Sequence, residues 1–398
     1  MSDTAETQRV KATSSRRLTF GYLFALYFIL GGAETMISPL FPLLRDDLQL
    51  DESHQAVLLA VVAAGIASFN LIGGASTRWL SERSLIRLAA AILSIGMLIS
   101  GTAQSFAPLL IGQACLGVAF GLFFPPALAA VTRSSPEAPG KAIAIYGLAY
   151  SFGLASAALS GTVGQDHWRW VFILSAIPGL ATFLWAPRWS EPEVDSVALP
   201  LLAQLREYSR VQAYRLAGLA SFGGVSMHYV VIGFAPVYFV DAGVGIGLVA
   251  SLIAIGRVLS APVKLVGGAL YDRRGGPWTA RLMMSTTSAI GLLVMLLPPD
   301  IGVFFLIPFV GVAVSVLPVA NAMLVAALPP RAGWGIGTFR AALLGSAALL
   351  AGAVSLLLRY LELEVLMIAV LTLPALIAVW LHRAVRSNEG GPAVDPAY

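Results

Sequence analysis

The fold of this chain is indicated by the stretch Gly268-Ala-Leu-Tyr-Asp272-Arg-Arg-Gly275, a glycine- and charge-rich turn between two long apolar segments. A weaker copy, Gly73-Gly-Ala-Ser-Thr-Arg-Trp-Leu80, lies 195 residues earlier. Each copy separates the second and third apolar segments of its half of the chain. A turn repeated at half the chain length predicts a duplicated membrane protein with two related halves.

The composition supports a membrane protein. Hydrophobic residues make up 58% and charged residues 12% of the chain, against about 25% charged in a typical soluble domain. The apolar runs approach the ~20 residues that a spanning helix needs, and they lack the period-two alternation of barrel strands. We therefore predict an all-α integral membrane fold with twelve spans, at 19–42, 55–76, 84–102, 107–132, 140–163, 168–186, 213–240, 246–270, 278–297, 301–328, 335–358 and 363–382.

The distribution of lysine and arginine predicts the orientation of these spans. With the N-terminus inside, 19 cations fall on the inner side, 3 on the outer side and 3 within spans. Cytoplasmic loops carry such an excess of cations, so both termini are expected in the cytoplasm. The net charge of +4 is then a signal of topology. No basic cluster carries interleaved aromatic residues, and we expect no nucleic-acid partner.

The spans group into two bundles joined by a polar loop. The predicted organisation is a cytoplasmic tail, a six-helix bundle, a cytoplasmic central loop, a second six-helix bundle and a second cytoplasmic tail, at 1–18, 19–186, 187–212, 213–382 and 383–398. An offset of 194 residues superimposes Pro42 on Pro236 and Glu34 on His228. Parallel halves of this kind place a substrate cavity on the axis between them.

The turn pattern G-x-L-x-D-R-x-G resembles the signature of the major facilitator superfamily (MFS), where it links helices 2–3 and 8–9. The stretches Trp168-Arg-Trp-x-Phe172 and Phe234-Ala-Pro-Val-Tyr-Phe-Val-Asp-x-Gly243 are also similar to that family. The resemblance covers essentially the whole chain. It implies a secondary transporter of the bacterial inner membrane, working as a monomer by alternating access and without a cofactor. The gating motif would comprise Gly268, Asp272, Arg273, Gly275, Gly73 and Arg78.

The chain departs from the family pattern in three places. The acidic position of the first turn is Thr77, which should weaken the gate on that side. Helix 4 carries Gln113 where the family has an arginine often associated with proton coupling. Helix 5 lacks the Gly-Pro of the drug-antiporter signature, and its small residues from Gly147 to Gly161 are expected to serve close helix packing.

Two ionisable residues are candidates for proton coupling. Glu34 lies past the midpoint of the first span, and a charge at a helix centre costs at least ~2.5–3.5 kcal/mol, so a functional role is favoured over a permanent ion pair. It resembles the acid in helix 1 of some drug/proton antiporters of the superfamily. His228 could relay protons, because a small shift moves the pKa of a histidine across physiological pH, and it matches Glu34 by pseudo-symmetry. A buried histidine that only forms hydrogen bonds is the alternative.

A second set of residues is predicted to line the substrate cavity. Arg257 and Lys264 are seven residues apart, which places them on one helix face about 10 Å apart. They form a cationic stripe for an anionic group; the alternatives are a helix contact for Arg257 and extension toward the loop for Lys264. Arg340, near the start of its span, is expected to extend toward the lipid–water boundary and not to bind a ligand. The other polar candidates are Asn70, Gln113, Tyr146, Tyr150, Tyr229 and Asn321.

These features together predict a proton-coupled exporter of a small anionic or zwitterionic organic solute, such as a drug, a metabolite or a siderophore-like compound. Uptake of an organic anion is the alternative, and a non-transporting membrane sensor is an alternative of another class. The sequence contains no phosphate-binding loop, no metal-ligand spacing and no nucleophile–base pair within the spans. An enzyme is therefore not expected.

Overall fold

The computed structural model describes residues 2–76, 79–134, 139–165, 167–187, 206, 210–327 and 333–389. Within these ranges every regular element is a helix. Ten segments are long and apolar enough to cross a membrane, and a shorter apolar helix covers Trp168–Leu184. The predicted all-α membrane fold is thus confirmed. The count of twelve spans stays a prediction, and most of the predicted central loop lies outside the described residues.

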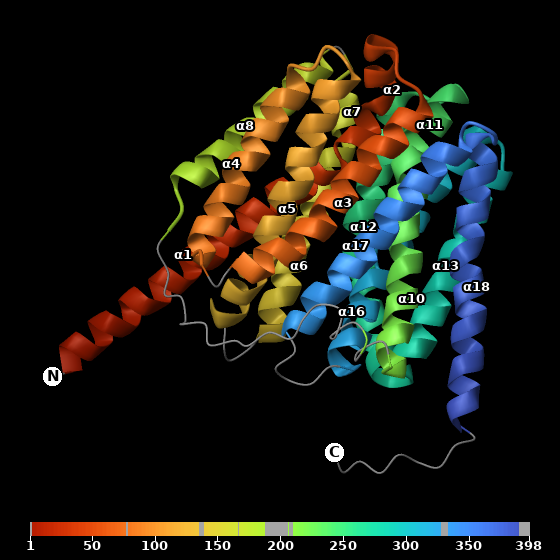
Figure 1. Cartoon of the computed structure of the whole chain (residues 1–398). Coiled ribbons are helices and arrows are strands. Elements are labelled where there is room, and N and C mark those ends of the chain that lie inside the picture. Colours follow the sequence, from red (N-terminus) through yellow and green to blue (C-terminus); the bar gives the residue numbers. More distant parts are fainter. Residues whose placement is uncertain are drawn as a thin grey trace.

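The two halves of the chain form two groups of helices (Figure 1). The first group comprises α1 (Ser2–Thr35), α2 (Ile37–Leu48), α3 (Glu52–Ser76), α4 (Glu82–Gly101), α5 (Phe106–Ser134), α6 (Pro139–Ala158), α7 (Ser160–Val163) and α8 (Trp168–Leu184). The second comprises α10 (Gln212–Ser226), the π-helix η1 (Met227–Ile232), α11 (Gly233–Asp241), α12 (Ile246–Arg274), α13 (Gly276–Leu296), α14 (Pro299–Gly302), the 3₁₀ helix η2 (Val303–Phe305), α15 (Leu306–Ala313), α16 (Val316–Ala327), α17 (Gly333–Leu357) and α18 (Leu363–Glu389).

The two halves meet along three pairs of helices. Helix α3 packs against α17, α6 against α12, and α2 against α11. The α2–α11 pair lies at the top of Figure 1, whereas α1 begins and α18 ends at the bottom. We call the top the Arg45 end and the bottom the Asp272 end, because Arg45 belongs to α2 and Asp272 to the last turn of α12.

The turn that indicated the fold is shorter than the sequence predicts. Residues Gly268 to Arg274 continue α12, and only Gly275 leaves the helix, with φ +80° and ψ 161°. The charged residues lie beyond the apolar segment and can extend the helix, while the positive φ is accessible to glycine at little cost. The prediction of an eight-residue turn was therefore wrong, and the chain reverses at a single glycine.

Small residues bring helices close together inside the first half. A side chain at Gly153 of α6 would collide with the backbone carbonyl of Phe28 in α1, and one at Gly161 would meet the carbonyl of Pro39. Gly147, on the same helix as Gly153, has open space around it. The predicted packing role is confirmed for Gly153 and Gly161, and such contacts are how spanning helices associate.

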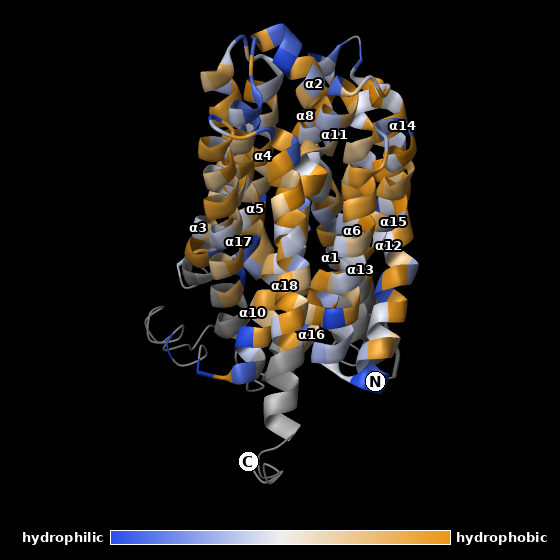
Figure 2. Cartoon of the chain, turned by 90° about the vertical axis from the view of Figure 1, so that its right-hand side faces the viewer, coloured by the Kyte–Doolittle hydropathy of each residue, from blue (hydrophilic) through white to orange (hydrophobic). Residues whose placement is uncertain are grey.

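The outer surface of the helices is apolar between two more polar ends (Figure 2). Large hydrophobic side chains are exposed around the bundle, among them Ile177, Leu265 and Leu349. Exposed apolar area on this scale is unusual for a soluble monomer. It fits a surface that faces lipid, and it leaves the polar side chains of the interior as the place to look for a site.

Candidate substrate and proton site

The first helices of the two halves are both irregular at the same depth. The first span is interrupted at Met36, between α1 and α2, and Pro39 follows one turn later. In the second half the π-helix η1 separates α10 from α11 and carries His228 and Tyr229. Positions 36 and 230 correspond under the 194-residue offset of the predicted repeat. Single π-helical turns often occur at functional sites, and here the irregular turns face each other across the two halves.

Glu34 is buried between the halves and is held by one tyrosine from each. The Tyr150 hydroxyl in α6 donates to Oε2 of Glu34 at 2.7 Å, and the Tyr229 hydroxyl in η1 donates to Oε1 at 2.7 Å. Only 5% of Glu34 is exposed. Both carboxylate oxygens therefore have a donor, and one of the two hydrogen bonds joins the N-terminal half to the C-terminal half. Glu34, Tyr150 and Tyr229 were all predicted site residues.

An aromatic cluster lies beside Glu34. Tyr27 of α1 stacks on Tyr146 and on Tyr150, with ring centroids 4.3 and 5.1 Å apart. Phe120 and Phe124 of α5 complete the cluster, each about 6 Å from Tyr27. Flat, mostly apolar faces of this kind are what binding sites for ring-containing solutes present.

Arg340 is a site residue that the sequence analysis missed. Its guanidinium carbon lies 3.5 Å from the centroid of the Phe124 ring, in a cation–π contact across the two halves. It also interacts electrostatically with Glu34 and Tyr27. Its position near the start of its span favours a side chain that extends to the lipid–water boundary. The Phe120/Phe124 pair, spaced four residues apart on the facing helix, was the available signal for a cationic partner.

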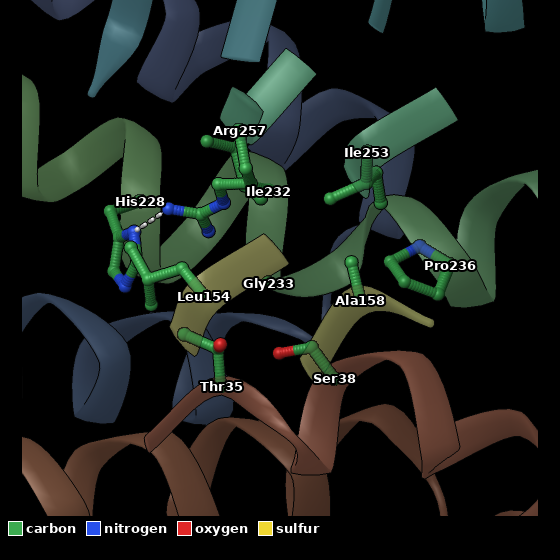
Figure 3. A pocket seen from close by; sticks show the side chains of 10 residues that line it. All are labelled: Thr35, Ser38, Leu154, Ala158, His228, Ile232, Gly233, Pro236, Ile253 and Arg257. Carbon is green, nitrogen blue, oxygen red and sulfur yellow. Dashed lines mark hydrogen bonds between the residues drawn. The ribbon is translucent and has the colours of Figure 1, made fainter. Parts of the chain in front are cut away.

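Arg257 and His228 form a second pair in the membrane interior. Nη1 of Arg257 in α12 lies 3.3 Å from Nδ1 of His228 in η1. Both residues are buried, and Nε of Arg257 has no hydrogen-bond partner among the described residues. The two side chains line a cavity of about 20 Å³ between the halves. Figure 3 shows Thr35 and Ser38 of the first span on its opposite wall, with their hydroxyl groups facing each other.

The remaining predicted cavity residues do not all join these two groups. Lys264 donates to Oγ of Ser151 at 2.6 Å, a hydrogen bond between the halves on the side of Arg257 toward the Asp272 end. Gln113 donates to Ser100 and so links α5 to α4 within the first half. Asn70 is buried and finds no partner among the described side chains, and Asn321 is exposed.

The gating residues of the two repeats differ in their surroundings. Asp272 and Arg273 are exposed on the last turn of α12. Gly73 lies in α3 where a side chain would meet the α5 backbone at Gly121 and Leu122, so it serves helix packing. Arg78 lies outside the described residues. A lock between Asp272 and a neighbouring arginine therefore stays a prediction.

The Arg45 end is closed by bonds between the halves. Arg45 donates twice to Asp241, with Nη1–Oδ2 at 2.8 Å and Nη2–Oδ1 at 2.6 Å. Deeper in, Gln55 donates to the carbonyl of Gly233 at 2.8 Å. Contacts between the halves thus extend from this end down to Glu34. Two polar groups and an aromatic cluster thus lie between the two helical bundles, where the sequence predicts the substrate cavity.

Comparison with known proteins places the chain in a family. A family model described as Major Facilitator Superfamily matches residues 23–331. The chain belongs to this superfamily. Transport of a small molecule across a membrane, rather than enzymatic catalysis, is the activity that this membership indicates.

Curated relatives align with only part of the chain. The purine ribonucleoside efflux pump NepI of Escherichia coli (strain K12) is 32% identical over 181 residues, covering 44% of this chain and 45% of the relative. The proton myo-inositol cotransporter hmit-1.1 of Caenorhabditis elegans is 27% identical over 185 residues, covering 42% of this chain and 30% of the relative. The chain therefore spans less than half the length of these relatives.

Solved structures match over nearly the whole chain. A bacterial homologue of the human lysosomal transporter Spinster, in an inward-facing and unoccupied conformation, shares 16% identity with a TM-score of 0.73, covering 95% of this chain and 99% of that chain. The D-xylose–proton symporter shares 16% identity with a TM-score of 0.72, covering 91% of this chain and 96% of that chain. At this identity the agreement establishes the fold of the superfamily.

Proposed function

We propose that this protein exports a small organic solute in exchange for protons, by alternating access, with Glu34 as the proton-carrying group. The observation that supports this proposal best is the pair of hydrogen bonds to Glu34, one from each half. A buried carboxylate between two helical halves that move relative to each other is the kind of intramembrane ionisable group that marks a proton pathway.

Protonation of Glu34 would change how strongly the halves are joined. The bond from Tyr150 lies within the first half and is kept when the halves rock, whereas the bond from Tyr229 joins the halves and must break. Hydrogen bonds to an ionised carboxylate are roughly twice as strong as neutral ones. A proton on Glu34 would weaken the link to Tyr229. Proton binding would then favour the conformation in which the halves have separated at this level.

The orientation of the chain assigns a direction to the observed conformation. The predicted charge bias puts the Asp272 end in the cytoplasm, so the closed Arg45 end would face outward. In that orientation the outer end would be the one sealed by Arg45 and Asp241. Solute would enter from the cytoplasm, and opening of the outer end would release it.

The first solutes to test are purine ribonucleosides. A relative bears the name of a purine ribonucleoside efflux pump, and the rings of Tyr27, Phe120 and Tyr150 offer faces on which a base can stack. Proton-coupled uptake is the second candidate, because another relative is named as a proton cotransporter. The direction of the proton flux distinguishes the two.

The experiment uses the full chain in proteoliposomes that contain a pH-sensitive dye, with inosine, adenosine and organic anions added in turn. Export by exchange predicts proton movement opposite to solute movement, and uptake predicts movement in the same direction. Glu34→Gln should abolish the proton signal and leave solute binding intact. Glu364→Gln, which changes an exposed carboxylate on α18, is the matched control and should behave as wild type. Equal proton signals in wild type and Glu34→Gln would refute the role of Glu34.

A further inference from the structure

The cavity beside Arg257 is a second polar site, separate from the two hydrogen bonds that hold Glu34. Its lining comes from both halves of the protein. The first half contributes Thr35 and Ser38 from α1 and α2 and Leu154 and Ala158 from α6 and its end, and the second half contributes His228 and Gly233 from η1 and α11 and Arg257 from α12. We propose that this cavity binds a single small anionic group, either the carboxylate of the transported solute or a free halide.

The hydrogen-bonding groups that line the cavity are mainly donors. A guanidinium has donors and no acceptor, so Nδ1 of His228 must accept the hydrogen bond from Arg257. The neutral imidazole then carries its hydrogen on Nε2. Thr35 and Ser38 add two hydroxyl groups on the opposite wall (Figure 3). No acidic residue lines the cavity, so the lining can surround a negative charge with donors.

Arg257 has no carboxylate in direct contact among the described residues. It is 2% exposed, and none of the ion pairs in the described part of the chain includes it. The nearby carboxylate of Glu34 is already bonded to two tyrosines. Lys264 adds a further positive charge on the same helix face. Arg257 has a hydrogen bond to His228 and an electrostatic interaction with Glu34, but no described carboxylate forms an ion pair in direct contact with it. A buried cation in this situation is costly, and a bound anion would reduce that cost.

The size of the cavity limits what it can hold. Its volume is about 20 Å³, and a space of roughly 10–15 Å³ on this measure is enough for one water molecule. A halide ion or one end of a carboxylate fits this space, whereas a nucleobase does not. The base or ring of a solute would have to lie elsewhere, and the aromatic cluster around Tyr27 is the available surface.

The proposed anion site extends the proposed function by favouring one class among the solutes to be tested, namely the organic anions over the neutral ribonucleosides. It rests on the proposed function only for the identity of the occupant. The binding of an anion by the purified protein does not require proton coupling, so the two proposals can fail separately.

The test measures the thermal unfolding midpoint of the purified full-length protein while sodium acetate is added, with acetamide as the neutral molecule of the same shape. Acetate should raise the midpoint saturably and acetamide should not. Arg257→Gln should weaken the apparent acetate affinity roughly 10- to 100-fold, as expected for a lost charge-assisted hydrogen bond. Arg274→Gln is the matched control, because it removes the same charge from an exposed position on the last turn of the same helix, and it should keep the affinity.

A second variant covers the case in which Arg257→Gln does not fold. Thr35→Val removes one hydroxyl group from the opposite wall and keeps the shape of the side chain, and it should weaken acetate roughly 2- to 10-fold. Competition between chloride and acetate would assign the site to free small anions, and an acetate effect without competition would assign it to carboxylates.

The proposal is overturned if acetate and acetamide act alike on wild type, or if Arg257→Gln and Thr35→Val keep the wild-type affinity. If the anion test fails in this way but Glu34→Gln loses the proton signal, the proposed export function is retained and only the anion site is rejected. The reverse pattern, with anion binding intact and equal proton signals, would remove the coupling model and keep the anion site.

Discussion

Replacing Asp241 by asparagine should open the Arg45 end of the protein. The carboxylate of Asp241 in α11 accepts two hydrogen bonds from Arg45 in α2, so this ion pair joins the two halves at the closed end. The substitution keeps the size of the side chain and removes its charge. The bond to Asp241 raises the pKa of Arg45 above its usual range, so the arginine is charged at any pH near neutral. The opening caused by the substitution should therefore be the same between about pH 6 and 8.

The size of the effect follows from the geometry and exposure of the pair. The two hydrogen bonds of 2.6 and 2.8 Å are bidentate, which is the stronger arrangement for arginine and a carboxylate. The side chains are 22% and 45% exposed, so water screens their attraction. Exposed pairs contribute about 0.2–1 kcal/mol, and the upper end applies here. A loss of about 1 kcal/mol shifts the ratio of open to closed molecules roughly 5-fold.

Thiol accessibility measures this ratio. Ser38 is buried beneath the closed end and can be replaced by cysteine in a Cys115→Ala background, since Cys115 is the only cysteine of the chain. A membrane-impermeant thiol reagent added outside should label Ser38→Cys roughly 5-fold faster when Asp241 is asparagine. The exchanged pair Arg45→Asp with Asp241→Arg should bring the rate back toward that of the unaltered pair.

An ion pair at the same end supplies the control. Arg169 and Asp47 are bonded at 2.6 Å with similar exposure, and both belong to the first half. Asp47→Asn should therefore leave the labelling rate unchanged. Equal acceleration by Asp47→Asn and Asp241→Asn, or no acceleration by either, would refute the view that the Arg45–Asp241 pair holds the halves together.

Three further predictions concern single side chains. Tyr229→Phe removes the hydrogen bond between Glu34 and the second half, and the number of protons moved per solute in proteoliposomes should fall, whereas Tyr150→Phe should reduce it less because that bond lies within one half. Gly153→Val should lower stability by about 1–3 kcal/mol through the collision with α1, seen as a lower unfolding midpoint, while the same change at Gly147 should be tolerated. Gly275→Ala should cost about 1–3 kcal/mol because of its positive φ, and an unchanged midpoint would argue against a fixed reversal at this residue.

The fold was largely predictable because its determinants are local and repeated. Apolar runs of fixed length, the bias of lysine and arginine, and a turn copied at half the chain length each depend on residues close in sequence. The extent of the turn was not predictable in the same way. The residues from Gly268 to Arg274 can form either a loop or the end of a helix, and only the backbone shows that the reversal falls on Gly275.

The site was predicted in part, and the difference between success and failure has a physical origin. Glu34 and Arg257 were found because a charge within an apolar span is costly wherever it points. The partners of these charges depend on which helix faces meet, and that is a property of the assembled bundles. Tyr27 reaches the site from α1 without a local signal of doing so. Arg340 reaches it from α17, although a position near the start of a span favours the lipid–water boundary.

The position of these charges bears on how the protein can work. Glu34 interacts electrostatically with two arginines, Arg340 over the aromatic cluster and Arg257 beside the small cavity. A change in its protonation therefore alters the field at both places where a solute could bind. If an anionic group occupied the Arg257 cavity, a negatively charged Glu34 would oppose its binding and a neutral one would not. Solute and proton would then promote each other's binding without direct contact, so an anionic occupant of this cavity would favour the cotransport named as the second candidate over exchange.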